Sequence, residues 1–159
     1  MSSWERTHRR YRLVYAVADA IALRGPEVID EWQAAIHAEF GGMDGFLKDV
    51  QRRWYTAVDA YLDTVLEDEP ADMDAAVAEI MWSVATTDRG LRLVLDGFAD
   101  HPALAEGDAY HRRSLLALTG VDQDALVPVQ GADRQPACRR ALGAARRALS
   151  GSLRATEPA

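Results

Sequence analysis

The stretch FGGMDGFLKDVQRRWYTAVDAYLDTVL, residues 40–66, contains a helix stop, a helix start and the longest amphipathic helical pattern in the chain. Gly41 and Gly42 can adopt the positive φ values that end a helix, and Asp44 is expected to accept hydrogen bonds from the free amides of the next one. Apolar residues then recur at spacings of three and four, at Leu47, Val50, Trp54, Val58, Leu62 and Val65. The face is widened by Phe46, Tyr55, Tyr61 and Leu66. So broad a face must be covered on more than one side, so we predict that this helix is the central element of the fold.

Two further helical patterns precede this stretch. Residues 4–24 carry apolar side chains at helical spacing and end at Gly25 and Pro26. Pro26 is a favourable first residue for a second helix, which is predicted to continue to Phe40.

Four more helices are predicted after it. The first covers residues 73–85, and the second is a short helix that is capped by Thr86, Thr87 or Asp88 and ends before Pro102. The third covers residues 108–119 and ends at a Gly120 C-cap, and the fourth covers residues 137–153. Residues 121–136 are predicted to form a connection with one helical turn near Asp122. No strand pattern is present, so the sequence predicts an all-α bundle of about seven helices.

The charge is unevenly distributed along the chain. The net charge is −7, but residues 1–13 carry +3, residues 129–159 carry +4, and the segment between them carries −14. A body this acidic repels phosphate backbones, so any contact with nucleic acid is expected through the Arg-rich arms, with a strong dependence on salt. Solvated helix faces are the simpler interpretation of both arms.

Composition favours a single cytoplasmic domain. The one cysteine, Cys138, excludes an internal disulfide. No apolar run approaches the roughly 18 residues that span a bilayer, and the first residues lack the apolar centre of a signal peptide. We therefore expect no membrane partner.

Two spacings raise the alternative of a metal site. One pair is Glu5 and His8 and the other is Asp108 and His111, and the two residues of each pair are one helical turn apart. Di-metal bundles use two such pairs together with a carboxylate from each of two other helices. Glu31 and Glu79 are the candidates for these two carboxylates. Glu5, however, lies in a first helical turn and His8 lies among arginines. Solvated helix faces are the favoured interpretation, and no nucleophile, catalytic base or phosphate-binding loop is recognised.

Aromatic and apolar side chains on several helices are the other candidate site. Such residues usually form the core of a bundle, but as a group they also line pockets for flat or apolar ligands. The predicted ligand-binding residues are Trp54, Tyr61, Met81, Trp82 and Phe98.

The order of these segments resembles a TetR-family transcriptional regulator. The run YRLVYAVADAIALRGPE, residues 11–27, is similar to the first helix of that family, and residues 40–66 are similar to its junction into a long connecting helix. Residues 82–121 are similar to parts of its ligand-binding domain. The resemblance implies three small DNA-binding helices, an effector pocket among the remaining helices, and a homodimer formed by the last helices.

The chain departs from that family between Glu27 and Phe40. The family would place a helix, a turn and a recognition helix here, whereas this interval has room for one helix only. The family positions that hold phosphates correspond to His37, Glu39 and Met43, and the last two are unsuited to contacting a phosphate. We therefore do not expect conventional operator binding, and we assign no DNA-binding residue.

The sequence thus predicts a non-enzymatic, TetR-like homodimer that binds a small apolar or aromatic effector or a protein partner such as a related regulator. It needs no cofactor and no metal. Residues 1–43 are predicted to form a degenerate three-helix-like region, residues 44–155 a ligand-binding and dimerisation region, and residues 156–159 a tail. The alternative function is that of a small helical metal-dependent protein or enzyme that uses Glu5, His8, Asp108 and His111. A third possible function is that of an interaction module without a cavity.

Overall fold

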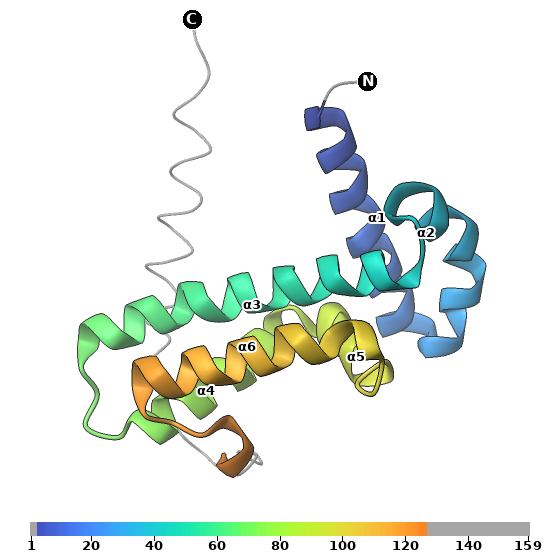
Figure 1. Ribbon diagram of the computed structural model, residues 1–159. Coiled ribbons are helices and arrows are strands. Elements are labelled where there is room, and N and C mark those ends of the chain that lie inside the picture. The colour runs from blue at the N-terminus through green and yellow to red at the C-terminus, as the bar shows by residue number, and fades with distance from the viewer. Residues whose placement is uncertain (1–2, 127–159) are drawn as a thin grey trace, which may run out of the picture.

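The computed structural model describes residues 3–126, and all regular structure in this part of the chain is helical (Figure 1). The elements are α1 (Ser3–Arg24), the 3₁₀ helix η1 (Pro26–Trp32), α2 (Gln33–Phe40), α3 (Met43–Asp68), α4 (Met73–Thr87), α5 (Arg89–Gly97), α6 (Pro102–Thr119) and the 3₁₀ helix η2 (Gln123–Ala125). The predicted all-α class is confirmed. The helix predicted over residues 137–153 lies outside the described residues. Within residues 3–126, no helix is both long enough and apolar enough to cross a membrane.

The central element is α3, as the apolar pattern predicts. Its buried face includes Phe46, Leu47, Val50, Trp54, Val58, Leu62 and Val65. It contacts α2, α4, α5 and α6, and in Figure 1 it spans the molecule, with α4 and α6 running along one side and α1 and α2 at its N-terminal end. One cluster of buried apolar residues extends from Val14 of α1 to Val121 after α6, so the two predicted regions share a single core.

The second predicted helix is not one α-helix. Residues 26–32 form η1, and α-helical geometry begins only at Gln33. A 3₁₀ helix has three residues per turn, and this period places the buried Ile29 and the half-buried Trp32 on the same side. The prediction of a single helix was wrong because the periods of 3.0 and 3.6 are hard to distinguish over seven residues.

Gly41 and Gly42 have the positive φ values that the sequence predicts, but Asp44 does not cap α3 as predicted. Gly41 closes α2 in the left-handed conformation, with φ of 78° and its amide donating to the His37 carbonyl. Gly42, with φ of 138°, is the N-cap of α3, and no side chain caps this end. Asp44 lies within the first turn, where its charge still favours the positive end of the helix dipole.

The α6 helix begins six residues earlier than the sequence predicts. His101 is its N-cap, and its Nδ1 accepts a hydrogen bond from the Ala103 amide at 3.3 Å. Pro102 occupies the first turn, where its missing amide hydrogen costs nothing. Gly120 ends the helix in the left-handed conformation, and η2 provides the turn predicted near Asp122.

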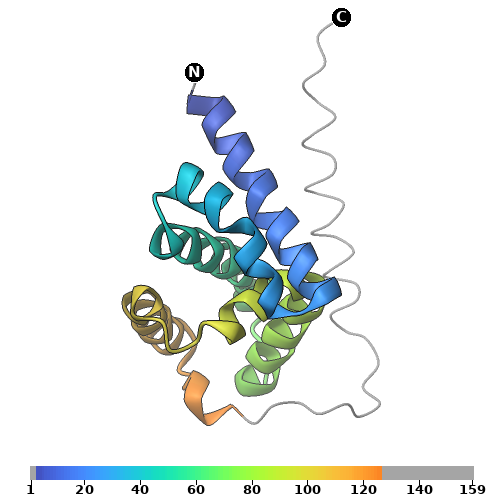
Figure 2. The same cartoon turned by 90° about the vertical axis from the view of Figure 1, so that its right-hand side faces the viewer.

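A close crossing joins α1 to α5. A Cβ added to Gly90 would lie 2.8 Å from the carbonyl carbon and oxygen of Ala18, so only glycine allows the two backbones to approach this closely. Figure 2 shows α1 crossing the N-terminal end of α3, next to the segment of chain that contains α5. This contact fixes the N-terminal helix to the rest of the bundle.

We expect Gly90→Ala to lower the free energy of unfolding by about 1–3 kcal/mol, because the added methyl group must push two helix backbones apart. The measurement is urea unfolding followed by circular dichroism. Gly97→Ala on the same helix is the control, since its Cβ would have only an ordinary 4.0 Å contact with Pro26. Equal stability of the two variants would contradict the close crossing.

Candidate functional site

The five predicted ligand-binding residues lie on α3, on α4 and immediately after α5, but in different environments. Trp54 is 2% exposed and is a core residue, with the Arg92 guanidinium 5.4 Å from its ring centroid. Trp82 is 59% exposed to solvent. Tyr61, Met81 and Phe98 are half-buried and pack against the core cluster. The structure therefore places three of the five at the boundary between core and solvent.

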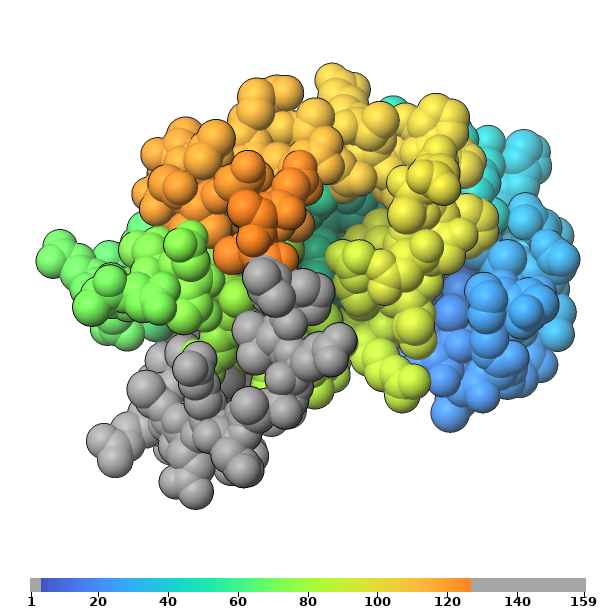
Figure 3. Space-filling model, turned by 90° about the horizontal axis from the view of Figure 1, so that it is seen from below, coloured from blue at the N-terminus to red at the C-terminus, as the bar shows by residue number. Residues whose placement is uncertain are grey.

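The surface is hollowed between α5 and α6, with α3 at the base of the hollow (Figure 3). Both α5 and α6 contact α3, and these contacts fix the positions of the helices around the hollow. A recess with an apolar helix at its base is the general form of a small-molecule site in a helical bundle.

A polar cluster between α3 and α6 was not predicted. The side-chain amide of Gln51, which is buried, donates to the Leu104 carbonyl at 2.9 Å and to Asp108 Oδ1 at 2.7 Å. The Tyr55 hydroxyl donates to the same Asp108 oxygen at 2.5 Å. This oxygen therefore accepts two hydrogen bonds from α3 and connects that helix to α6.

His111 completes the cluster on the other side of Tyr55. The two rings are stacked, with centroids 3.8 Å apart, and His111 Nδ1 lies 3.9 Å from Asp59 Oδ1. The imidazole is buried, and its Nε2 has no hydrogen-bond partner among residues 3–126. Burial lowers the pKa of His111 below its usual value, although Asp59 and Asp108 act in the opposite direction. The same environment raises the pKa of Tyr55, through burial and then through its bond to Asp108.

Gly107 makes room for this cluster. A Cβ at this position would lie 2.1 Å from Gln51 Oε1, so a side chain on α6 would displace the buried amide. Two sequence signals point to the cluster: Gln51 interrupts the apolar face of residues 47–65, and Asp108 and His111 are one turn apart. Neither signal identifies the partner helix, which is decided by the packing of α6 on α3.

The four residues of the metal alternative are not assembled into one site. Glu5 and His8 lie on α1, where His8 stacks on the Trp4 ring, whereas Asp108 and His111 lie on α6 within the polar cluster. In the described part of the chain, no group of three or more His, Cys, Asp or Glu residues is placed to hold a metal ion. The spacing that suggested ligands instead positions Asp108 and His111 to contact α3.

The Arg-rich N-terminal helix is folded onto the junction before α3. Arg9 Nε donates to Glu39 Oε1 at 2.7 Å, and Arg10 Nε donates to the Glu39 backbone carbonyl at 2.9 Å. The hydrogen bond from Arg9 lowers the pKa of Glu39. Of the other residues at this junction, His37 is exposed and Met43 is half-buried.

We expect the protein to lose stability as the pH falls from about 7.5 to about 5.5. The unfolded chain takes up a proton on His111 near pH 6.5, but burial lowers the pKa of that group in the folded state. The stabilising contribution is therefore complete above the unfolded pKa and is lost as the pH falls toward the folded pKa. The midpoint of urea unfolding at the two pH values measures the effect.

His111→Phe keeps a ring in contact with Tyr55 and removes the titrating group, so it should weaken this pH dependence. An undiminished difference between the two pH values in that variant would show that other groups are responsible.

No family model, no curated protein and no solved structure matches this chain.

Proposed function

We propose that this protein is a cytoplasmic, TetR-like regulatory protein without enzymatic activity, which acts as a homodimer and binds a small apolar or aromatic effector or a protein partner. The observation that carries the proposal is the arrangement around residues 40–66. Two short helical segments, η1 and α2, enter α3 through the Gly41–Gly42 junction, and α4, α5 and α6 pack along this 26-residue helix. This arrangement follows the segment order on which the resemblance was based.

Conventional operator binding is not part of the proposal. Between Gly25 and α3, only the eight residues of α2 are α-helical, and η1 and α2 follow each other without a turn. Reading the major groove requires a recognition helix that projects from the protein. Arg9, which could otherwise contact a phosphate, is paired with Glu39.

The effector site is proposed at Tyr61 and Met81, two of the predicted ligand-binding residues, on the contacting helices α3 and α4. Both side chains are half-buried against the core. Phe98 is also half-buried but lies toward the N-terminal end of α3, since its ring is 6.3 Å from that of His101, whose Nε2 lies 3.7 Å from Asp44. Partly exposed apolar side chains lose their remaining contact with water when a flat apolar ligand covers them, which favours binding by about 25 cal/mol per Å².

Titration with the neutral fluorescent probe N-phenyl-1-naphthylamine tests this site. The unmodified protein should bind the probe saturably, and Met81→Glu should weaken binding by roughly tenfold or more, because a carboxylate at the site must be desolvated. Met73→Glu is the matched control, since Met73 is a half-buried methionine on the same helix outside the predicted set. Failure of the unmodified protein to bind the probe saturably would refute an apolar effector site.

The dimer interface is proposed to include the outer face of α6. Leu116 lies on this helix and is 50% exposed, so it is available to a second copy. The resemblance also assigns the last predicted helix, residues 137–153, to the dimer interface, and this helix lies outside the described residues.

Sedimentation equilibrium should give about twice the chain mass of 17.5 kDa for the unmodified protein. Leu116→Asp should shift the mass toward the monomer, because an unpaired carboxylate in an apolar interface costs several kcal/mol. Leu23→Asp, on α1 and 85% exposed, introduces the same charge away from this face and should leave the mass unchanged. A monomeric unmodified protein would remove the homodimer from the proposal.

A further inference from the structure

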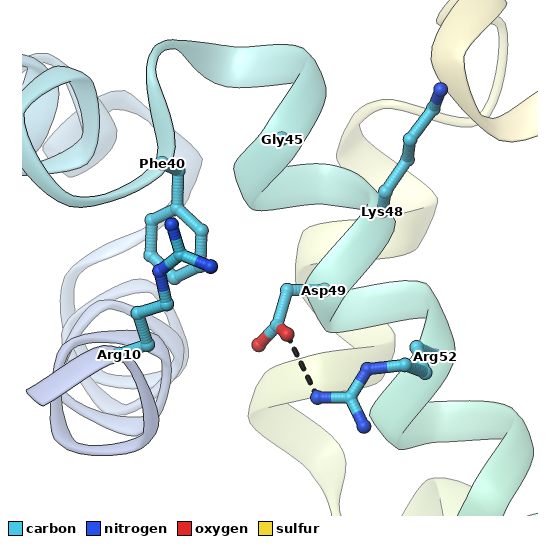
Figure 4. A pocket seen from close by; sticks show the side chains of 6 residues that line it. All are labelled: Arg10, Phe40, Gly45, Lys48, Asp49 and Arg52. Carbon is cyan, nitrogen blue, oxygen red and sulfur yellow. Dashed lines mark hydrogen bonds and ion pairs between the residues drawn. The ribbon is translucent and has the colours of Figure 1, made fainter. Parts of the chain in front are cut away.

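A groove lies between α1, the end of α2 and the N-terminal half of α3. It is lined by Arg10, Phe40, Gly45, Lys48, Asp49 and Arg52, and its volume is about 240 Å³ (Figure 4). The four α3 residues are spaced by three, one and three, which places them on one side of that helix. Of the four charged side chains, three are cationic, although the chain as a whole carries a net charge of −7.

Arg10 makes its hydrogen bond to a backbone carbonyl rather than to a carboxylate. Its Nε donates to a neutral backbone carbonyl, that of Glu39, and its guanidinium lies 5.2 Å from the centroid of the Phe40 ring. The carboxylate of Glu39 is bound by Arg9 instead. Because the ring and the carbonyl fix the guanidinium, its remaining N–H groups are oriented before any ligand binds.

Asp49 is the one carboxylate in the lining, and it is shared between two arginines. It accepts hydrogen bonds from Arg52 at 2.8 Å and from Arg53 at 2.7 Å. Burial alone would raise the pKa of Asp49, but the two arginines outweigh it, and the pKa lies below its usual value. Because Arg53 already neutralises Asp49, the charge of Arg52, whose side chain is 65% exposed, is in excess.

Lys48 adds a third positive charge at the edge of the groove. It is the only lysine in the sequence, and it forms no ion pair with another residue in the part of the chain that the structure describes. Figure 4 shows its side chain extending away from Arg10. Its flexible four-carbon stem can follow a ligand, whereas Arg10 and Arg52 provide the fixed contacts.

We propose that this groove binds a small molecule through a compact dianionic group, a phosphate ester or a short dicarboxylate, held between the guanidinium groups of Arg10 and Arg52. The lining has more cationic than anionic side chains, and an anion with several acceptor oxygens can accept charge-assisted hydrogen bonds from them. Gly45 shapes the wall, since a Cβ there would lie 2.4 Å from the Phe40 carbonyl oxygen and would force α2 and α3 apart. This site is separate from the apolar effector site, and the two can fail independently.

Titration of ¹⁵N-labelled full-length protein with inorganic phosphate, and separately with malonate, tests the proposal at constant ionic strength. Chemical shifts of the Gly45 amide and of the Nε resonances of Arg10 and Arg52 should change saturably with both anions. Arg52→Gln should raise the dissociation constant roughly tenfold, which corresponds to the loss of one charge-assisted hydrogen bond. Arg10→Gln should have a similar effect.

Arg24→Gln is the matched control, because it removes one positive charge from an exposed position on α1 that is paired with Glu31 outside the groove. It should bind both anions as the unmodified protein does. If Arg10→Gln does not fold, Arg52→Gln alone tests the proposal. Arg52→Gln is expected to fold, because Arg53 still binds Asp49 in the Arg52→Gln variant.

Two results would overturn the proposal. The first is the absence of saturable shifts, or equal affinities in the unmodified protein and Arg52→Gln. The second is a response of the same resonances to duplex DNA but not to phosphate or malonate, which would assign the groove to a nucleic-acid backbone.

Discussion

The structure depends on burying the broad apolar face of α3. Phe46, Trp54 and Val58 are among the most buried side chains of the described residues, and they lie on one face of one helix. A single neighbouring helix cannot cover a face of this width, so α2, α4, α5 and α6 all contact α3. The position of each candidate site follows from this packing, because every site has α3 as one wall or as its base.

Two glycines determine how closely α5 approaches α1 and how closely α6 approaches α3. Gly90 lets α5 meet α1 at Ala18, and Gly107 lets α6 lie over the Gln51 side chain. At the second contact the space is filled by polar groups, and Gln51, Tyr55 and Asp108 satisfy one another there. Satisfied buried polar groups specify one register of α6 on α3, since sliding the helix would leave donors unpaired.

Two arginines of α1, Arg9 and Arg10, contact other residues of the protein. Arg9 neutralises Glu39, and Arg10 lies on Phe40, so the beginning of α1 is attached to the junction before α3. This attachment removes one charge that an operator-binding arm would use and leaves another facing a groove.

The sequence by itself determined the helical class, the central role of residues 40–66 and the Gly41–Gly42 junction, because helical periodicity and positive φ are local properties. It misplaced the starts of α2 and α6, where a 3₁₀ turn and a histidine cap replaced the expected signals. Only the tertiary structure decided that Trp82 is exposed, that Asp108 and His111 face α3, and that three cationic residues line one groove. These features join residues distant in sequence, so they depend on which helix faces meet, and a pattern within one helix does not contain that information.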